Sequence, residues 1–199
     1  MPVMKKWIVT GGIGTGKSSF CQTLKRLMPE LVLFSSDDAV HQAYELPEVR
    51  NRIAAALGIK QMPGSNPEAF RAKVREAVIE APAARKRLEQ ILHPHVWTEL
   101  KKLETSTTER GGKVLVAEVP LYYETGNAVV ADKIIVLAAS QAVQLDRVRT
   151  RGVDEATALA MLKMQLPLSE KVALADMVVW NDGSVSALEQ AAITLLRQV

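Results

Sequence analysis

The sequence predicts an α/β protein built on a parallel sheet of about five strands, and three observations carry this prediction. First, short continuous apolar runs at residues 31–34, 113–119, 133–138 and 177–180 are typical of strands buried on both faces. Second, segments with apolar residues at helical spacing separate these runs. Third, another apolar run ends at Val9 and leads into a glycine-rich stretch. Strands that alternate with helices in this way form doubly wound sheets.

The glycine-rich stretch, residues 11–18, reads Gly-Gly-Ile-Gly-Thr-Gly-Lys-Ser and matches the pattern G-x-x-x-x-G-K-[ST]. Glycines let the loop turn successive N–H groups towards one anion, and the helix that follows adds its positive N-terminal end. The stretch therefore predicts a P-loop for ATP, with Lys17 at the β- and γ-phosphates and Ser18 on a bridging Mg²⁺. The expected nucleotide-binding residues of this loop are Gly12, Ile13, Gly14, Thr15, Gly16, Lys17, Ser18 and Ser19.

Length and composition indicate one ordinary globular domain, with 48% hydrophobic and 24% charged residues in 199. The N-terminal apolar run is short and carries Lys5 and Lys6, so we expect neither a signal peptide nor a membrane span. The single cysteine, Cys21, agrees with a reducing compartment, and the cytoplasm is the expected location. The longest basic run, residues 85–87, is typical of a solvated helix face, so we expect no nucleic-acid partner.

Between the second and third strands, residues 39–105 have the spacing of successive helices. Helices are expected to begin at Pro47 and Pro82, a polar loop lies around residues 62–67, and His93-Pro94-His95 interrupts the last helical stretch. So long an insertion predicts a separate lobe that accepts a substrate. We therefore divide a single domain into a core (1–38, 106–140 and 172–199), a substrate lobe (about 39–105) and a lid (about 141–171).

Carboxylates follow two of the predicted strands, at the sheet edge where ligands of α/β proteins bind. If the chain stays extended from residue 31 to Asp37, then Ser35 and Asp37 share one side and Asp38 points away or begins the next helix. Asp37 is then expected to face the site. Glu118 ends the next strand and is either a surface carboxylate or a partner of the Mg²⁺ ligands.

A helical hairpin is predicted between the last two strands, with three arginines just before Gly152. Arg147 and Arg151 are four residues apart, which predicts that they share one helix face. Such arginines are usually solvated. Beside a P-loop, however, they are candidates for the cations that a mobile lid brings to a transferring phosphoryl group.

Taken together, these features resemble the dephospho-CoA kinase family over nearly the whole chain. The resemblance rests on Thr10 to Ser18, Asp37 before His41, Leu92-His93-Pro94, Val119-Pro120-Leu121 closing at Glu124, Gln144 with Arg147 and Arg151, Gln165, Lys171, Ala175-Asp176 and Asn181. It implies a P-loop kinase core with a helical CoA-binding lobe and a lid. It also implies that ATP phosphorylates the ribose 3′-hydroxyl of dephospho-CoA. Asp37 then resembles the base or orienter of that hydroxyl, Arg147 and Arg151 resemble lid cations, and Asn181 lies near the adenine.

The chain departs from the family's pattern at two places. Ser35 stands where the family commonly has the first carboxylate of Asp-x-Asp, and Tyr122-Tyr123 stand where it has Leu-Phe. The histidines indicate no metal centre, because His93 and His95 do not share a helix face. We interpret His93 as a structural or pocket residue, whereas His41 is either a substrate contact or a surface residue.

Two other functions fit the P-loop. The first is a kinase of another small hydroxyl substrate, such as a nucleoside or a sugar acid, because the substrate is selected by lobe side chains that the sequence does not place. The second is a non-enzymatic nucleotide switch or an ATPase bound to nucleic acid. Against this second function, the chain lacks both an Asn-Lys-x-Asp motif for guanine and a basic stripe interleaved with aromatic residues.

Overall fold

The computed structural model describes residues 4–60, 66–79, 81–126 and 129–197. The chain divides into two compact units. The sheet unit comprises Met1–Ser35 and Leu103–Val199, and the helical unit comprises Ser36–Lys102. Each unit is described by itself below.

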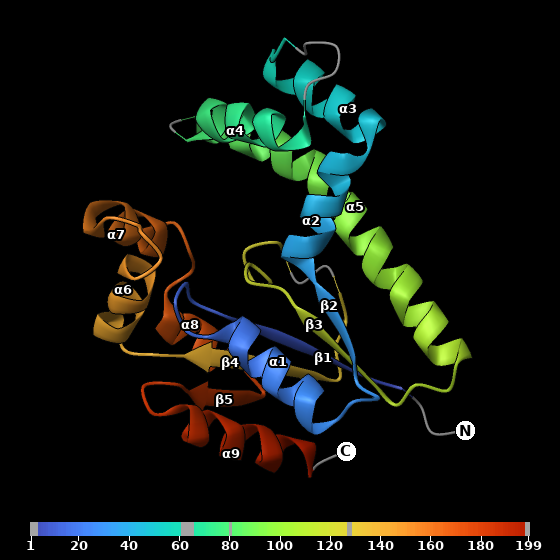
Figure 1. The fold of residues 1–199 in the computed structure, drawn as a ribbon, viewed down its shortest axis with the longest axis vertical. Coiled ribbons are helices and arrows are strands. Elements are labelled where there is room, and N and C mark those ends of the chain that lie inside the picture. The colour runs from blue at the N-terminus through green and yellow to red at the C-terminus, as the bar shows by residue number, and fades with distance from the viewer. Residues whose placement is uncertain (1–3, 61–65, 80, 127–128, 198–199) are drawn as a thin grey trace. The chain divides into compact units, whose positions relative to one another are not determined.

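The described residues of the sheet unit form one five-stranded sheet in the order β2-β3-β1-β4-β5 (Figure 1). Its strands are β1 (Lys5–Gly11), β2 (Val32–Ser35), β3 (Val114–Glu118), β4 (Lys133–Ala138) and β5 (Met177–Trp180). Every pair is parallel, which confirms the fold predicted from the apolar runs. In this register Glu118 lies beside both Val9 and Ser35, so β3 brings its carboxylate to the edge at which the P-loop begins.

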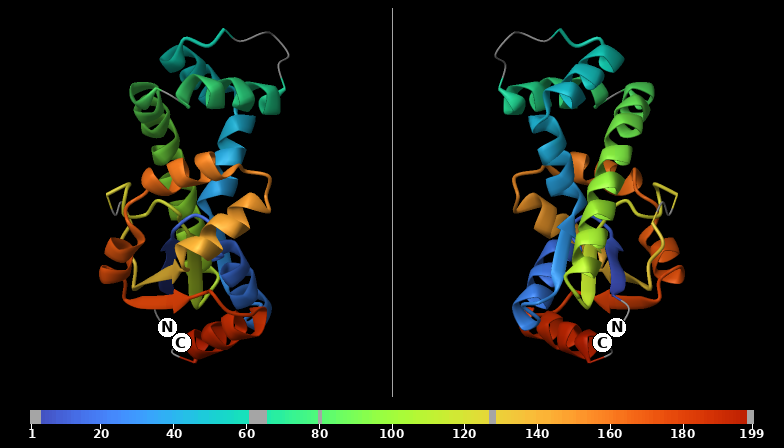
Figure 2. Two further views of the ribbon diagram at one scale, coloured as in Figure 1. Left: turned by 90° about the vertical axis from the view of Figure 1, so that its left-hand side faces the viewer. Right: turned by 90° about the vertical axis from the view of Figure 1, so that its right-hand side faces the viewer.

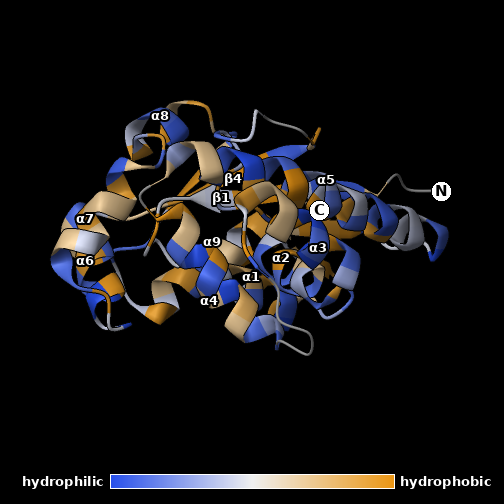
Figure 3. Cartoon of the chain, turned by 90° about the horizontal axis from the view of Figure 1, so that it is seen from above, coloured by the Kyte–Doolittle hydropathy of each residue, from blue (hydrophilic) through white to orange (hydrophobic). Residues whose placement is uncertain are grey.

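Helices cover both faces of this sheet. Helices α1 (Lys17–Leu27) and α9 (Val185–Leu196) lie side by side on one face, and α8 (Leu168–Ala173) lies on the other (Figure 3). The helices carry both hydrophilic and hydrophobic residues, and the apolar residues of α1 and α9 pack on the strands. The core between β1 and α1 includes Trp7, Phe20 and Leu24, all nearly inaccessible to solvent. This packing fixes the strand and the helix that flank the P-loop.

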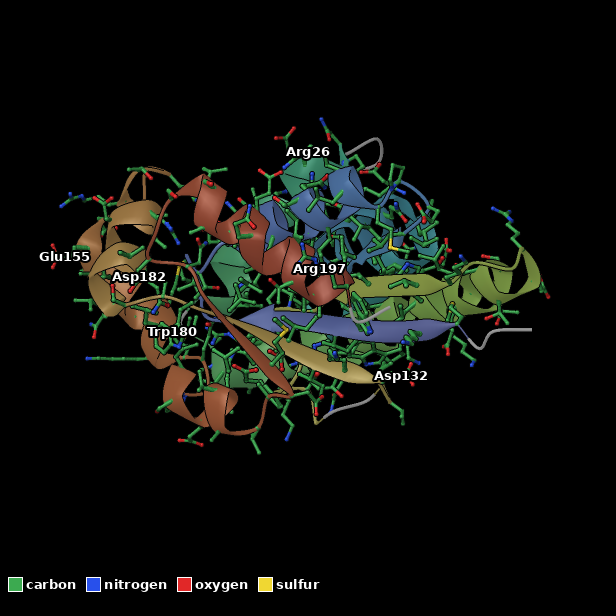
Figure 4. The ribbon with its side chains drawn as sticks, turned by 90° about the horizontal axis from the view of Figure 1, so that it is seen from below. Arg26, Asp132, Glu155, Trp180, Asp182 and Arg197 are labelled. Atoms are coloured by element: carbon green, nitrogen blue, oxygen red, sulfur yellow. The ribbon has the colours of Figure 1, made fainter. Side chains whose placement is uncertain are left out.

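Aspartates fix the ends of β4 and its neighbours by accepting backbone N–H groups. Asp132 accepts from Lys6, Asp176 from Ile134 and Asp182 from Ser140, each at 2.7 Å. Asp132 lies at one end of the sheet, and Asp182 lies with Trp180 at the opposite end (Figure 4). The latter end carries the carboxyl termini of the strands and the glycine-rich loop.

The helical unit is a group of helices (Figure 2) and has its own core. Its helices are α2 (Ser36–Glu45), α3 (Pro47–Leu57), α4 (Pro67–Val78) and α5 (Pro82–Glu109), whose residues from 103 onward belong to the sheet unit. Ala43 of α2, Ile53 of α3, Phe70 of α4 and Leu92 of α5 meet in this core. Proline begins α3, α4 and α5, as expected where the first N–H has no helical partner. The unit is thus a helical body inserted between β2 and β3.

The prediction of an extended chain through Asp37 is wrong. Strand β2 ends at Ser35 and α2 begins at Ser36, so Asp37 and Asp38 both lie in the first turn of a helix. Two carboxylates are favourable there because the helix N-terminus carries a partial positive charge. The alternation of side chains along a strand therefore does not apply to Asp37.

The chain also differs from the predicted helix ends. His93-Pro94-His95 lies inside the continuous helix α5 and does not interrupt it. A proline removes one helical hydrogen bond, but the helix continues because Leu92, Val96 and Leu100 are buried along it. In the lid, the second helix of the predicted hairpin spans Glu155–Lys163 and is followed by α8, a short helix that the sequence periodicity did not predict. The polar loop around residues 62–67 lies mostly outside the described residues.

Candidate active site at the P-loop

The P-loop needs glycine for its backbone angles and for space. Gly11, Gly14 and Gly16 have φ angles of 139°, 74° and 91°, a region that favours glycine. A Cβ at Gly14 would lie 2.7 Å from the carbonyl oxygen of Gln144, and one at Gly11 would clash with the carbonyl of Leu137. The loop is therefore packed tightly against β4 and the start of the lid.

Lys17 and Ser18 begin helix α1 directly after the loop. The Lys17 ammonium donates to the carbonyl oxygen of Gly12 at 2.9 Å and to that of Gly11 at 3.4 Å, so its charge lies over the loop. The Ser18 hydroxyl donates to the Glu118 carboxylate at 2.7 Å. A lysine, a hydroxyl and a carboxylate thus meet at the N-terminus of α1, where the helix dipole favours anions.

Asn181 and Arg147 bind the far side of the loop. The Asn181 amide donates to the Thr15 carbonyl at 2.9 Å, and the side chain is buried. The Arg147 guanidinium donates to the Asn181 carbonyl at 2.8 Å and to the Gly14 carbonyl at 3.2 Å. The structure therefore brings Arg147 and Asn181 together with the P-loop from distant parts of the chain.

Arg151 does not share a helix face with Arg147, and that prediction is wrong. Helix α6 (Gln141–Arg149) ends before Arg151, and Gly152 follows with a φ of 84° that turns the chain towards α7 (Glu155–Lys163). A four-residue spacing places two side chains on one face only while the helix lasts. Arg151 is exposed in this turn.

Three residues from the resemblance, to which the sequence assigned no role, also meet near the loop. The Gln165 side-chain oxygen accepts the Ile13 backbone N–H at 3.1 Å. Glu124 accepts the Leu166 N–H at 2.9 Å and pairs with the ammonium of Lys171 at 2.7 Å. Lys171 is completely buried. Periodicity does not reveal these contacts, because they join side chains far apart in the sequence.

A pocket of about 930 Å³ opens between the lid hairpin and α8. It is bordered by Gly12 of the P-loop, by Gln144 and Gln165, and by Trp180 at the end of β5. The Gln144 amide nitrogen donates to the Ala139 carbonyl at 2.9 Å, while its buried oxygen has no hydrogen-bond partner among the described residues. This pocket adjoins the P-loop on the side of the Ile13 N–H contact.

The remaining predicted residues belong to the helical unit. Asp37, Asp38 and His41 are exposed on α2, and the ring of His93 lies 6.5 Å from that of Trp97 on α5. Within the residues that the structure describes, no three His, Cys, Asp or Glu side chains are grouped to hold a metal ion.

Cys21 is a core residue of α1 and not a reactive one. Its side chain is buried among the residues that pack on β1. Burial, followed by the charge of Glu118, raises the pKa of the Cys21 thiol far above its ordinary value. Because the thiolate is the nucleophilic form, this thiol is inert near neutral pH.

Comparison with known proteins decides the family. The family model described as dephospho-CoA kinase matches residues 7–187, which include the P-loop, the helical unit and the lid. The chain belongs to the dephospho-CoA kinase family. A dephospho-CoA kinase from Bradyrhizobium diazoefficiens is 37% identical over 96% of this chain and 94% of its own length. One from Geobacillus kaustophilus is 32% identical over the same shares of the two chains.

Solved structures agree on the fold of this kinase. The protein TT1252 from Thermus thermophilus matches with a TM-score of 0.80 and 25% identity, over 98% of both chains. The dephospho-CoA kinase from Campylobacter jejuni matches with a TM-score of 0.65 and 22% identity, over 98% of this chain and 97% of its own. A search of the described helices finds none that is both long and apolar enough to cross a membrane.

Proposed function

We propose that this kinase transfers the γ-phosphoryl group of ATP to the ribose 3′-hydroxyl of dephospho-CoA, giving coenzyme A and ADP. The observation that carries the proposal is the built P-loop, with Lys17 over its carbonyls and Ser18 on Glu118, in a chain that matches the dephospho-CoA kinase family over residues 7–187. The family supplies the acceptor, and the P-loop supplies the phosphate chemistry.

The loop binds the triphosphate through its backbone N–H groups and through Lys17. Loop residues 12–16 present N–H groups, and the N-terminus of α1 adds its partial positive charge with Ser18 and Ser19 in its first turn. When the phosphates bind, the Lys17 ammonium exchanges its two carbonyl partners for phosphate oxygens. A cation beside the transferring group stabilises the charge that develops in the transition state.

The residues at the start of α1 fit Mg²⁺, which prefers oxygen ligands. Ser18 would hold the ion through its hydroxyl oxygen, and Glu118, 2.7 Å from that oxygen, would accept from the ion's water ligands. When bound, Mg²⁺ neutralises charge on the β- and γ-phosphates. The exposed position of Ser18 leaves its hydroxyl open to the ligand.

Asp37 acts as the base or orienter of the acceptor hydroxyl. It is exposed, and it follows two residues after Ser35, whose strand position is opposite Glu118. A carboxylate with an open oxygen accepts a hydroxyl proton as the oxygen attacks phosphorus. In this proposal the helical unit is the lobe that binds dephospho-CoA.

Arg147 and Arg151 are the lid cations, and Asn181 lies near the adenine. Arg147 is already held at the P-loop by its contacts to Gly14 and Asn181. Arg151 stands on the turn of the hairpin, so its charge reaches the phosphates by movement of residues 141–171, the lid. We also propose a cytoplasmic location, since the only cysteine is buried and forms no internal disulfide.

The test measures ADP release from ATP with dephospho-CoA, nucleosides, gluconate, shikimate or water alone as the acceptor. We expect turnover with dephospho-CoA to exceed turnover with every other acceptor by at least about a hundredfold, since a site that binds the whole acceptor directs its binding energy to the transition state. Phosphorus–proton correlation NMR of the product should locate the phosphate on the ribose 3′-oxygen. Equal rates with gluconate or shikimate would show that the acceptor has been misassigned, and equal rates with water would show an ATPase.

A further inference from the structure

The Ile13 N–H group is the starting point, because it belongs to the loop that cradles phosphates. In the structure this N–H donates to the side-chain oxygen of Gln165 at 3.1 Å. Backbone N–H groups of a P-loop are the donors that phosphate oxygens accept. The carboxamide oxygen of Gln165 therefore lies where it competes with a phosphate oxygen for one donor.

Gln165 is held in this place by a network of contacts around the buried Lys171, on its C-terminal side. The next residue, Leu166, donates its N–H to the Glu124 carboxylate at 2.9 Å. The same carboxylate oxygen pairs at 2.7 Å with Lys171, whose side chain is completely buried and also donates to the Pro120 carbonyl at 3.4 Å. A buried cation is retained only beside a counter-charge, so this pair fixes the backbone that presents Gln165.

The network ends on β1, the strand that leads into the P-loop. The Thr10 hydroxyl donates to the same Pro120 carbonyl at 3.2 Å. The connector between α7 and α8 is thereby linked to the P-loop directly, through Gln165 at Ile13, and indirectly to Thr10 of β1, through Glu124, Lys171 and Pro120. A shift of this connector consequently moves the oxygen that holds the Ile13 N–H.

We infer that Gln165 is a nucleotide-affinity residue of the phosphate site, and that Glu124 and Lys171 are its positioning residues. The side-chain oxygen of Gln165 accepts the Ile13 N–H in place of a phosphate oxygen. When the triphosphate binds, a phosphate oxygen replaces it. The connector is then released from the P-loop at one of its two attachments. The inference rests on the proposed function only in taking the triphosphate of ATP as the ligand of this loop.

Because Gln165 competes with a phosphate oxygen for the Ile13 N–H, the chemistry of each substitution determines whether the dissociation constant of ATP rises or falls. Gln165→Ala removes the competing oxygen, so the dissociation constant of ATP is expected to fall roughly three- to tenfold, the range of one hydrogen bond. Gln165→Glu places an anionic acceptor on the same N–H and repels phosphate, so the constant is expected to rise by about tenfold or more. Gln190→Glu makes the same charge change at an exposed residue of α9 and should alter the constant by less than about twofold.

The positioning role is tested with Lys171→Met, which keeps the length of the side chain and leaves Glu124, 20% exposed, in contact with water. Loosening the connector frees the Ile13 N–H, so ATP is expected to bind more tightly even though the protein melts at a lower temperature. In a Gln165→Ala background Lys171→Met should add nothing to ATP affinity, because the competitor is already gone. A purely structural role would instead weaken binding by the same factor in both backgrounds.

Calorimetric titration of the full chain with ATP and Mg²⁺, without acceptor, gives these constants, and thermal unfolding confirms that each variant is folded. If Lys171→Met does not fold, the dissociation constant of ATP for Gln165→Ala alone tests the inference. Unchanged or weaker ATP binding by Gln165→Ala would overturn the inference, as would equal effects of Lys171→Met in the two backgrounds. Failure of the unaltered chain to phosphorylate dephospho-CoA would overturn the proposed function instead, since the titration contains no acceptor.

Discussion

The P-loop and the lid segment, residues 141–171, reach the same site by different routes. The P-loop obtains its shape from its own glycines, and its lysine bonds to carbonyls only five and six residues away. The lid reaches the loop across 133 residues at Arg147 and across 152 residues at Gln165. A local motif thus builds the phosphate cradle, while long-range contacts decide how the cradle is covered.

This difference has a consequence for energetics. Local glycine geometry is part of the folded core and changes little when a ligand binds. Side-chain contacts such as those of Gln165 and Arg147 are hydrogen bonds that contribute about 1 kcal/mol each, and a bound phosphate can replace them. We therefore expect mutations in the P-loop to abolish chemistry and mutations in the lid to modulate it.

The largest effect is expected from Lys17→Ala. Removing the cation beside the transferring phosphoryl group should lower kcat by about a thousandfold or more. Lys25→Ala is the control, because Lys25 lies in the last turn of the same helix, away from the P-loop, and donates to the carbonyls of Pro29 and Leu31. Steady-state rates and melting temperatures should show lost turnover with little lost stability for Lys17, and the reverse for Lys25. If Lys17→Ala retained its activity, the expectation that P-loop mutations abolish the chemistry would be wrong.

Asp37→Asn extends the comparison to the helical unit. The change keeps the side-chain volume and removes the proton acceptor, so kcat should fall about a hundredfold while ATP affinity stays within a few-fold. Asp38→Asn changes the neighbouring charge in the same helical turn and should leave kcat almost intact. Both variants are measured at saturating ATP and dephospho-CoA. A damaging Asp38→Asn beside a harmless Asp37→Asn would reverse the assignment of the base.

Within the lid, Arg147→Ala and Arg151→Ala are expected to differ in stability more than in rate. Each should lower kcat by about tenfold, as expected for a cation that acts mainly in the transition state. Arg147→Ala should also lower the melting temperature, because it leaves the Gly14 and Asn181 carbonyls without this donor. Arg151 is exposed, so Arg151→Ala should have the same melting temperature as the unaltered chain. An equal loss of rate in Arg85→Ala would show that general charge, and not lid position, matters.

Glu118→Gln should shift the requirement for Mg²⁺. The amide still accepts from Ser18 but carries no charge to attract the ion's water ligands, so the Mg²⁺ concentration for half-maximal rate should rise about tenfold. Asp132→Asn removes a carboxylate at the opposite end of the sheet and should leave that concentration unchanged (Figure 4). Unchanged Mg²⁺ dependence in Glu118→Gln would remove Glu118 from the metal site.

The same difference between local motifs and long-range contacts explains which features the sequence could predict. The parallel sheet, the P-loop and the Ser18 and Glu118 positions follow from runs and motifs that are read over a few residues. An apolar run does not show where a strand ends and the next helix begins, so the sequence leaves the conformation of Asp37 conditional on an extended chain. Arg151 was assigned to a helix that ends at Arg149, since helix ends depend on packing. Gln165 and Lys171 find partners only through the tertiary fold.

The smallest effect is expected from Tyr122 and Tyr123, two adjacent residues of the same type whose hydroxyl groups differ in hydrogen bonding. Their rings meet edge to face at 5.4 Å in the segment between β3 and β4. The Tyr122 hydroxyl donates to the Val129 carbonyl at 2.8 Å, whereas the buried Tyr123 hydroxyl has no hydrogen-bond partner among the described residues. A buried hydroxyl without a partner has lost its hydration without compensation.

Tyr123→Phe, which restores the family's phenylalanine, should therefore raise the free energy of unfolding by about 1 kcal/mol, and Tyr122→Phe should lower it by about as much. Burial, more than the neighbouring Tyr122, raises the pKa of Tyr123 to about 12. The unfolded chain ionises this group near pH 10, so its ionisation does not change the free energy of unfolding below about pH 10 and lowers it as the pH rises towards 12. Urea unfolding at pH 7 and at pH 11 should thus show a smaller alkaline loss in Tyr123→Phe than in the unaltered chain. A destabilised Tyr123→Phe at pH 7 would mean that its hydroxyl binds ordered water, and the contrast between the two tyrosines would vanish.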